Sequence, residues 1–160
     1  MNVPFTLGRV ALVVLFILSG AQKLTDIAGT ADQIQAKLTI PSALADVISQ
    51  VEATVGMPIS QILAIVAAMI EVVGGLLIAF NVFTRTMAVV LLIFTAVTTF
   101  YMHDFWNMPA GADRTNNMIH ALKNLSIMGG LLILAAWPRR AVIVEEPGHE
   151  RIVGERVEPL

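Results

Sequence analysis

Long apolar runs dominate the chain and predict four membrane-spanning helices. Crossing the hydrocarbon core of a bilayer takes roughly 20 mostly apolar residues in a helix. Runs of about that length cover residues 5–24, 59–83, 86–103 and 118–137. Small residues such as the pairs Gly74-Gly75 and Gly129-Gly130 occur within these runs, and they allow membrane helices to pack closely. We therefore expect an all-α fold, an integral membrane four-helix bundle over residues 1–137.

The connection between the first two runs has a different pattern. After Pro41, apolar residues recur at helical spacing with polar residues between them, until Gly56 and Pro58 end the pattern. The apolar positions are Leu44, Val47, Ile48, Val51 and Val55. This segment is expected to form an amphipathic helix that lies in the outer membrane interface or caps the bundle. An ordinary soluble loop helix that rests on the spans is the alternative.

The first run also has features of a signal peptide. Arg9 precedes a short apolar stretch, and Ser19-Gly20-Ala21 resembles a cleavage site. However, Lys23-Leu24 is more typical of the end of a retained helix than of the start of a mature protein. We expect the segment to remain as the first span.

The basic residues favour an orientation with both termini in the cytoplasm. Basic residues are enriched on the cytoplasmic side of membrane proteins, and this orientation places six arginines there against four basic residues outside. The inner group comprises Arg9, Arg85, Arg139, Arg140, Arg151 and Arg156, and the outer group Lys23, Lys37, Arg114 and Lys123. We expect a multi-pass protein of the bacterial inner (plasma) membrane. Residues 138–160 would then be a cytoplasmic tail, either a hairpin or disordered.

The composition agrees with a membrane protein and excludes several classes of function. Hydrophobic residues make up 56% of the 160 residues and charged residues 14%, whereas soluble domains usually carry about 25% charged residues. The net charge is −2, and no cysteine is present. We therefore exclude a soluble enzyme, a protease and a nucleic-acid binder. The absence of cysteine also excludes disulfides, iron–sulfur clusters, covalent c-type haem and a thiol nucleophile.

Polar residues within the apolar runs are the main candidates for function. Ionisable groups near the bilayer centre cost at least about 2.5–3.5 kcal/mol, so each needs a partner or a role. Glu71 lies near the middle of the second run, too deep for its carboxylate to reach the surface. It shares a helix face with Gln61, Ala64, Ala68, Gly75 and Ile78, which indicates that it points into the bundle.

Several further polar residues are expected at the outer level of the bundle. His120, Lys123 and Asn124 share one face of the fourth run. The first run ends at Lys23, and the third ends at His103 and Asp104. The predicted cluster therefore comprises Lys23, Glu71, His103, Asp104, His120, Lys123 and Asn124. Within it we expect an ion pair between Glu71 and Lys123, because a lysine stem can extend down to a deeper carboxylate.

Each of these residues also has a purely structural interpretation. Lys23 can be an interfacial anchor, and Arg9 an anchor on the cytoplasmic side. His103 and Asp104 can simply cap the third helix. An ion pair between Glu71 and Lys123 can fix the helix register without any ligand.

The residue types in the cluster suit a quinone better than a metal. Lysine, histidine and asparagine supply hydrogen-bond donors for two carbonyl oxygens, and a buried carboxylate or histidine can exchange a proton. His103 and His120 lie on either side of one connection near a single membrane surface, so we predict no haem or metal. The match to a quinone rests on chemical compatibility.

The order of several motifs resembles the DoxX family of small bacterial membrane proteins. Leu7-Gly8-Arg9 with Ser19-Gly20 and Lys23-Leu24 resembles the opening signature of that family, and Glu71 to Leu77 followed by Phe83-Thr84-Arg85 resembles its second-helix motif and turn. His103 to Trp106 and His120 to Leu125 are similar to motifs of a common subgroup, so the resemblance spans about residues 7–135. Asn81 stands where the family usually has glycine, and asparagine also tolerates the left-handed conformation of a helix end.

The resemblance implies a four-helix inner-membrane protein. Some relatives are linked to quinol oxidase or thiosulfate:quinone oxidoreductase systems, and others to oxidative-stress responses. Three functions stay open: a subunit or small enzyme of a quinone-linked redox system, a non-catalytic anchor or assembly partner, and a transporter of protons or a small solute. The expected partners are the lipid bilayer and either a membrane redox protein or further copies of the chain. A transporter would need such an oligomer.

Overall fold

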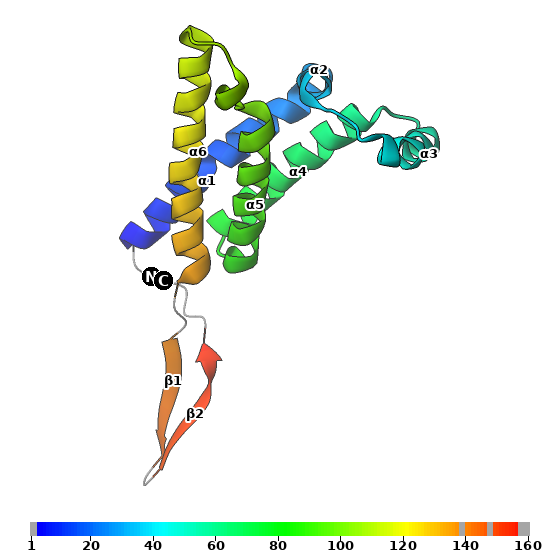
Figure 1. Cartoon of the computed structure of the whole chain (residues 1–160). Coiled ribbons are helices and arrows are strands. Elements are labelled where there is room, and N and C mark those ends of the chain that lie inside the picture. Colours follow the sequence, from blue (N-terminus) through cyan, green and yellow to red (C-terminus); the bar gives the residue numbers. More distant parts are fainter. Residues whose placement is uncertain (1–2, 138–139, 147–148, 157–160) are drawn as a thin grey trace.

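Four long helices arranged as two pairs make up most of the protein. The computed structural model describes residues 3–137, 140–146 and 149–156. Helix α1 (Val3–Thr25) packs along α4 (Ile59–Ala79), and α5 (Thr84–Met102) packs along α6 (Ala112–Ala136). Figure 1 shows the first pair running obliquely across the second. All four helices are long and apolar enough to cross a membrane, which confirms the prediction of a helical membrane bundle.

The two ends of the bundle differ. At one end, which we call the terminal end, lie the start of α1, the end of α4, the start of α5 and the end of α6 (Figure 1). The buried core gathers toward this end, where side chains from all four long helices meet: Val13, Phe16, Ile78, Ala88, Leu91, Leu131 and Leu134. At the opposite end, which we call the α2 end, a short helix follows α1 and another precedes α4.

Close contact between α1 and α4 depends on two glycines. A Cβ atom at Gly20 would lie 2.8 Å from the carbonyl oxygen of Ala68, and one at Gly75 would lie 2.7 Å from a side-chain carbon of Ile17. Real Cβ atoms do not approach this closely, so a larger residue at either site would push the helices apart. By contrast, Gly129 in α6 has no such neighbour within 4 Å.

A short helix that the sequence analysis did not predict follows α1. Helix α2 (Ile27–Lys37) starts after Asp26, whose Oδ1 accepts a hydrogen bond from the Gly29 amide at 2.9 Å. This is an N-terminal cap, and it satisfies an amide that the helix itself leaves unpaired. Helix α2 packs against α4 and contacts α1 and α5.

The predicted amphipathic segment forms a 3₁₀ turn, η1 (Ser42–Leu44), followed by α3 (Ala45–Val55). The left-handed conformation of Gly56, at φ +73°, ends the helix. No residue of α3 is buried; four of the five apolar positions are exposed, and Ile48 is half-buried. Most of the apolar side of the helix is therefore not covered by the spans.

The end of α4 and the start of α6 differ from the prediction. Helix α4 ends at Ala79 rather than near residue 83, since Asn81 and Phe83 adopt left-handed conformations with φ of 61° and 49°. The first turns of α6 are polar and start at Ala112, well before the apolar run, after the short helix η2 (Phe105–Asn107).

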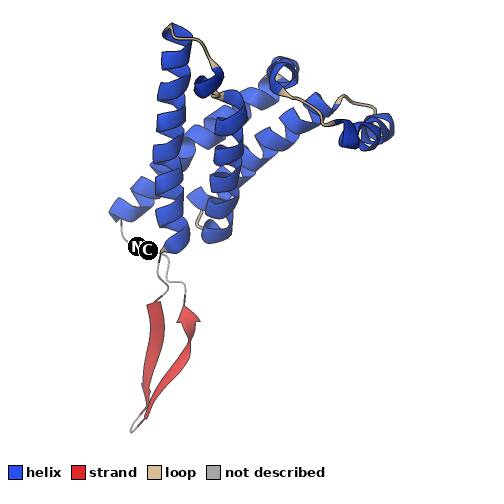
Figure 2. Ribbon diagram, viewed as in Figure 1, coloured by secondary structure: helices blue, strands red, loops and turns tan. Residues whose placement is uncertain are grey.

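The C-terminal tail contains a β-hairpin, one of the two forms expected for it. Strand β1 (Arg140–Glu146) pairs antiparallel with β2 (His149–Arg156), and Figure 2 shows this hairpin apart from the helices. Residues Arg140 and Arg156 are opposite each other, and an irregularity between Val142 and Ile143 shifts the register.

Candidate functional site

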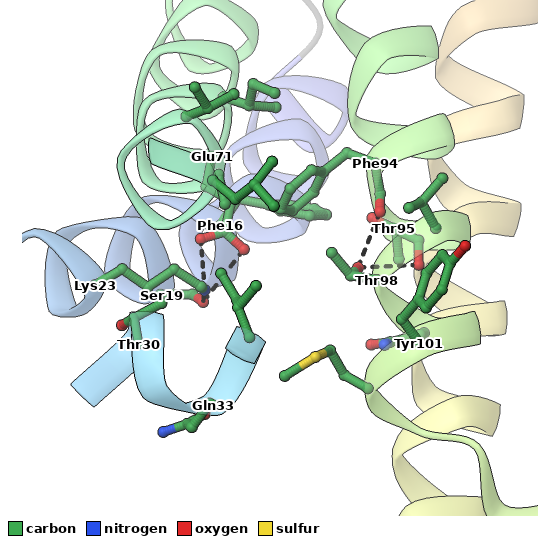
Figure 3. Close-up of a pocket in the computed structure, with 18 of the residues that line it drawn as sticks. Phe16, Ser19, Lys23, Thr30, Gln33, Glu71, Phe94, Thr95, Thr98 and Tyr101 are labelled. Carbon is green, nitrogen blue, oxygen red and sulfur yellow. Dashed lines mark hydrogen bonds and ion pairs between the residues drawn. The ribbon is translucent and has the colours of Figure 1, made fainter. Parts of the chain in front are cut away.

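An ion pair joins α1 to α4 within the bundle. Glu71 lies midway along α4 and is only 6% exposed, as predicted from the helix face that it shares with Ala68 and Gly75. Its Oε2 accepts a hydrogen bond from Lys23 Nζ at 2.7 Å, and its Oε1 accepts one from Ser19 Oγ at 3.4 Å. Lys23 Nζ also donates to Ser19 Oγ at 2.6 Å. The carboxylate, the ammonium and the hydroxyl thus form a closed triangle of polar contacts (Figure 3).

The predicted pairing of Glu71 with Lys123 is wrong. Helix α4 packs against α1 and α5, and within the described residues it makes no close contact with α6. Lys123 is exposed on α6, whereas Lys23 lies on the face of α1 that Gly20 brings against α4. The carboxylate and the amine do meet inside the protein as expected, but the amine belongs to the first span.

A cavity of about 690 Å³ adjoins this ion pair. Its walls come from α1, α2, α4 and α5, with Asn124 and Ile127 contributed by α6. Most of its surface is apolar, for example at Phe16, Ile70 and Phe94. Figure 3 shows Lys23, Ser19 and Glu71 on one side of the cavity and threonines of α5 on the other. The cavity lies toward the α2 end of the bundle and adjoins the packed core at Phe16.

Four of the seven predicted site residues line the cavity, namely Lys23, Glu71, His103 and Asn124. The amide nitrogen of Asn124 donates a hydrogen bond to Thr99 Oγ1 at 2.8 Å, which ties α6 to α5. The Nδ1 atom of His103 lies 3.2 Å from Asn117 Oδ1, so this hydrogen bond orients the ring.

The other three predicted residues do not line the cavity. Asp104 Oδ1 accepts a hydrogen bond from Lys37 Nζ at 2.8 Å, in an ion pair that links the end of α2 to the α5–α6 connection. The exposed ring of His120 stacks on that of His103 with 5.1 Å between centroids and 11° between planes. Lys123 is exposed on α6 and takes part in neither the ion pair nor the ring stack. The helical face predicted for α6 is therefore shifted, because Asn124 and Ile127 point to the cavity and Lys123 does not.

The α5 threonines are site residues that the sequence analysis missed. Thr95 and Thr98 line the cavity, and their hydroxyls donate to the carbonyls of Leu91 and Phe94 at 2.6 and 2.9 Å. A hydroxyl that donates to its own helix can still accept a hydrogen bond from another molecule. Their signal was present in the sequence as Thr95, Thr98 and Thr99 at helical spacing within an apolar run.

Arg9 does not have the anchoring role expected for it. It is 6% exposed at the terminal end of the bundle, and its Nη2 donates to the carbonyl oxygen of Ala79 at 3.3 Å. A snorkelling anchor would keep its charged group in water. The guanidinium instead reaches a carbonyl at the end of α4, where the helix leaves acceptors unpaired.

Comparison with known proteins places the chain in a family. A model of the DoxX family matches residues 5–104, which include most of α1, all of α2 to α5 and the Lys23–Glu71 pair. The chain belongs to the DoxX family. Its relatives include two proteins of Escherichia coli K12. Inner membrane protein YphA is 33% identical over 129 residues, which are 81% of this chain and 79% of YphA. Inner membrane protein YqjF is 31% identical over 134 residues, which are 84% of this chain and 83% of YqjF.

No solved structure matches the chain with significance. The matched DoxX region ends before α6, so the motif from His120 to Leu125 lies outside it. The DoxX assignment therefore rests on the first three spans and their connections.

Proposed function

We propose that this DoxX-family protein binds a membrane-dissolved quinone or quinol as a subunit or accessory of a quinone-linked redox system. The cavity beside Lys23 and Glu71 is the observation that carries this proposal. The relatives are named as inner membrane proteins, and we propose the same bacterial membrane for this chain, with both termini in the cytoplasm. Electrons would be exchanged with a membrane redox partner protein.

The size and lining of the cavity suit a flat ring with two carbonyl oxygens. Small-molecule sites usually enclose about 300–1,000 Å³ and are mostly apolar with a few placed polar groups, and this cavity has about 690 Å³. Phe16 and Phe94 offer aromatic surface to a ring. Polar groups occur on opposite walls, as two carbonyl oxygens require.

Lys23 has the capacity to bind one of those oxygens. An ammonium has three N–H donors, and the contacts with Glu71 and Ser19 use two. The third is available to a ligand, since the lysine side chain lines the cavity and is 26% exposed. A quinone supplies two-electron, two-proton chemistry when bound. In this proposal, Lys23 orients the ring, and the Glu71 carboxylate accepts a proton from the bound quinol.

The rim of the cavity favours a ligand that arrives through the lipid. Leu63 and Val66 of α4, together with Val97 and Tyr101 of α5, line the cavity and are also exposed, by 37–54%. These residues belong to spans, so their exposed surface faces the acyl chains. An apolar ligand with a long tail can then bind its ring inside and leave its tail between lipids.

The test is a binding titration with a short-chain ubiquinone analogue in mild detergent. We expect wild type and Lys123→Ala to bind equally, and Lys23→Ala to bind about tenfold more weakly or worse, because a hydrogen bond to a charged group contributes about 1.5–3 kcal/mol. The two variants remove the same side chain, and only one of them removes it from the cavity. Equal affinity of all three proteins, or no binding by wild type, would overturn the proposal.

Thr98→Val provides a second variant that leaves the ion pair intact. Its near-isosteric side chain removes one polar group from the opposite wall. We expect weaker binding with an unchanged melting temperature, so this variant separates ligand contacts from stability.

The closed triangle of contacts also supports a second candidate function, that of a non-catalytic anchor or assembly partner. Glu71 is already satisfied by Lys23 and Ser19, so the ion pair can fix α1 against α4 without a ligand. A wild-type protein that binds no quinone, together with a destabilised Lys23→Met variant, would favour this function.

A further inference from the structure

The segment formed by η1 and α3 has an apolar face that the described protein leaves mostly uncovered, with only Ile48 half-buried. Four large apolar residues, Leu44, Val47, Val51 and Val55, are 37–57% exposed. They recur at positions i, i+3, i+7 and i+11 and so form one stripe along the helix. Contiguous exposed apolar faces of this kind mark sites that contact a membrane or another protein.

The contact between α3 and α4 indicates how deep α3 lies relative to the membrane. The Glu52 side chain accepts a hydrogen bond from the Ile59 amide at 2.7 Å, and Ile59 is the first residue of the α4 span. Since a span begins at the bilayer surface, α3 is held at that surface at the α2 end of the bundle. The contact also caps the start of α4, which lacks a capping side chain at Pro58.

The orientation of the α3 axis agrees with a position at the bilayer surface. Figure 1 views α3 nearly along its axis, whereas α5 and α6 run upright in the same view. The axis of α3 is therefore steeply inclined to the α5–α6 pair. Because spans run broadly along the bilayer normal, α3 lies broadly in the plane of the membrane.

We propose that α3 is an interfacial helix whose apolar stripe binds the phospholipid surface at the α2 end of the bundle. The stripe would enter the boundary between headgroups and acyl chains, as in other amphipathic interfacial helices. This inference does not depend on the ligand of the cavity.

The charges of α3 identify the kind of surface. Its only charged residues are Asp46 and Glu52, and no basic residue is present. Attraction to anionic lipids therefore contributes nothing, and the binding rests on apolar burial. A zwitterionic phospholipid surface is the partner that fits.

A second copy of the chain fits the stripe less well. A stable protein interface buries about 800 Å² on each partner, and four exposed side chains on the short η1–α3 segment provide only part of such a surface. A single row of aliphatic side chains without aromatic or arginine anchors is also unlike an interface hot spot.

The cysteine-free sequence permits a direct test. Single variants Val51→Cys and Ala53→Cys would each carry a nitroxide label in proteoliposomes of zwitterionic phospholipid. Val51 lies within the stripe and Ala53 on the opposite face, and both are exposed, so neither label disturbs the core. Collision rates with oxygen, which partitions into lipid, and with a water-soluble nickel chelate report the surroundings of each label.

We expect the ratio of oxygen to nickel collisions to be several-fold higher at position 51 than at position 53. Equal access of the nickel chelate to both labels would show that α3 lies in water, and would overturn the proposal. Exclusion of both reagents at position 51 would show a protein contact, and spin–spin broadening would then identify a second copy. That outcome would also overturn it.

Discussion

Replacing Lys23 with methionine measures what the ion pair with Glu71 contributes to the fold. Methionine keeps an unbranched side chain of similar length but removes the charge. The carboxylate of Glu71, whose side chain is 8% exposed, would lose its cation and keep only the longer contact with Ser19. Removing one member of a buried pair costs about 3–5 kcal/mol. Since the lysine side chain is 26% exposed, water screens the pair and we expect a loss of about 2–3 kcal/mol.

A double-mutant cycle separates the pair from side-chain packing. Replacing both Lys23 and Glu71 with methionine removes both charges, and apolar residues in place of a buried pair are often neutral or stabilising. We therefore expect the double variant to be more stable than Lys23→Met alone. Unfolding in mixed detergent–SDS micelles, followed by tryptophan fluorescence, gives the four free energies of the cycle.

The matched control is Lys123→Met, at a site exposed on α6. This change should alter the free energy of unfolding by less than about 0.5 kcal/mol. If Lys23→Met and Lys123→Met had the same small effect, or if the two changes of the cycle were simply additive, the ion pair would contribute nothing to the association of α1 with α4.

Three further predictions use the same unfolding assay. Gly20→Val should reduce stability by several kcal/mol or prevent folding, because its Cβ would clash with the backbone of Ala68. The control Gly129→Ala, with open space around it, should be neutral or stabilise by up to about 1 kcal/mol. Equal effects of the two changes on stability would contradict the packing of α1 on α4. Lys37→Met breaks an exposed ion pair and should cost less than about 1 kcal/mol; a larger loss would show that α2 depends on this contact. Phe83→Gly should raise stability by about 1 kcal/mol, since the exposed residue adopts a left-handed conformation that favours glycine; lower stability would mean that its ring contributes more than its backbone strain.

The spans were predictable because their signal is local. A run of about 20 apolar residues has few stable alternatives to a membrane helix. Helix α2 was missed because it is short and polar, although Ile27, Ala31 and Ile34 recur at helical spacing after the capping residue Asp26. The end of α4 was placed too late because apolar character continues past Ala79, whereas the backbone turns at Asn81.

The partner of Glu71 was not predictable from depth alone. Lys23 and Lys123 both lie toward the same end of the bundle, and depth cannot distinguish them. The choice depends on which helices are neighbours, and this is decided by the fit of Gly20 and Gly75 against the opposite helix. Such complementarity involves two distant segments, so neither segment reveals it by itself.

The uneven packing along the bundle gives its two halves different mechanical properties. Interlocked side chains make the terminal half stiff, because dense interiors resist compression, whereas the half that surrounds the cavity has fewer contacts to lose when it deforms. A deformation of the bundle is therefore expected to move the cavity walls before it disturbs the core. Amide exchange should therefore be faster in the half of each long helix that surrounds the cavity than in the terminal half.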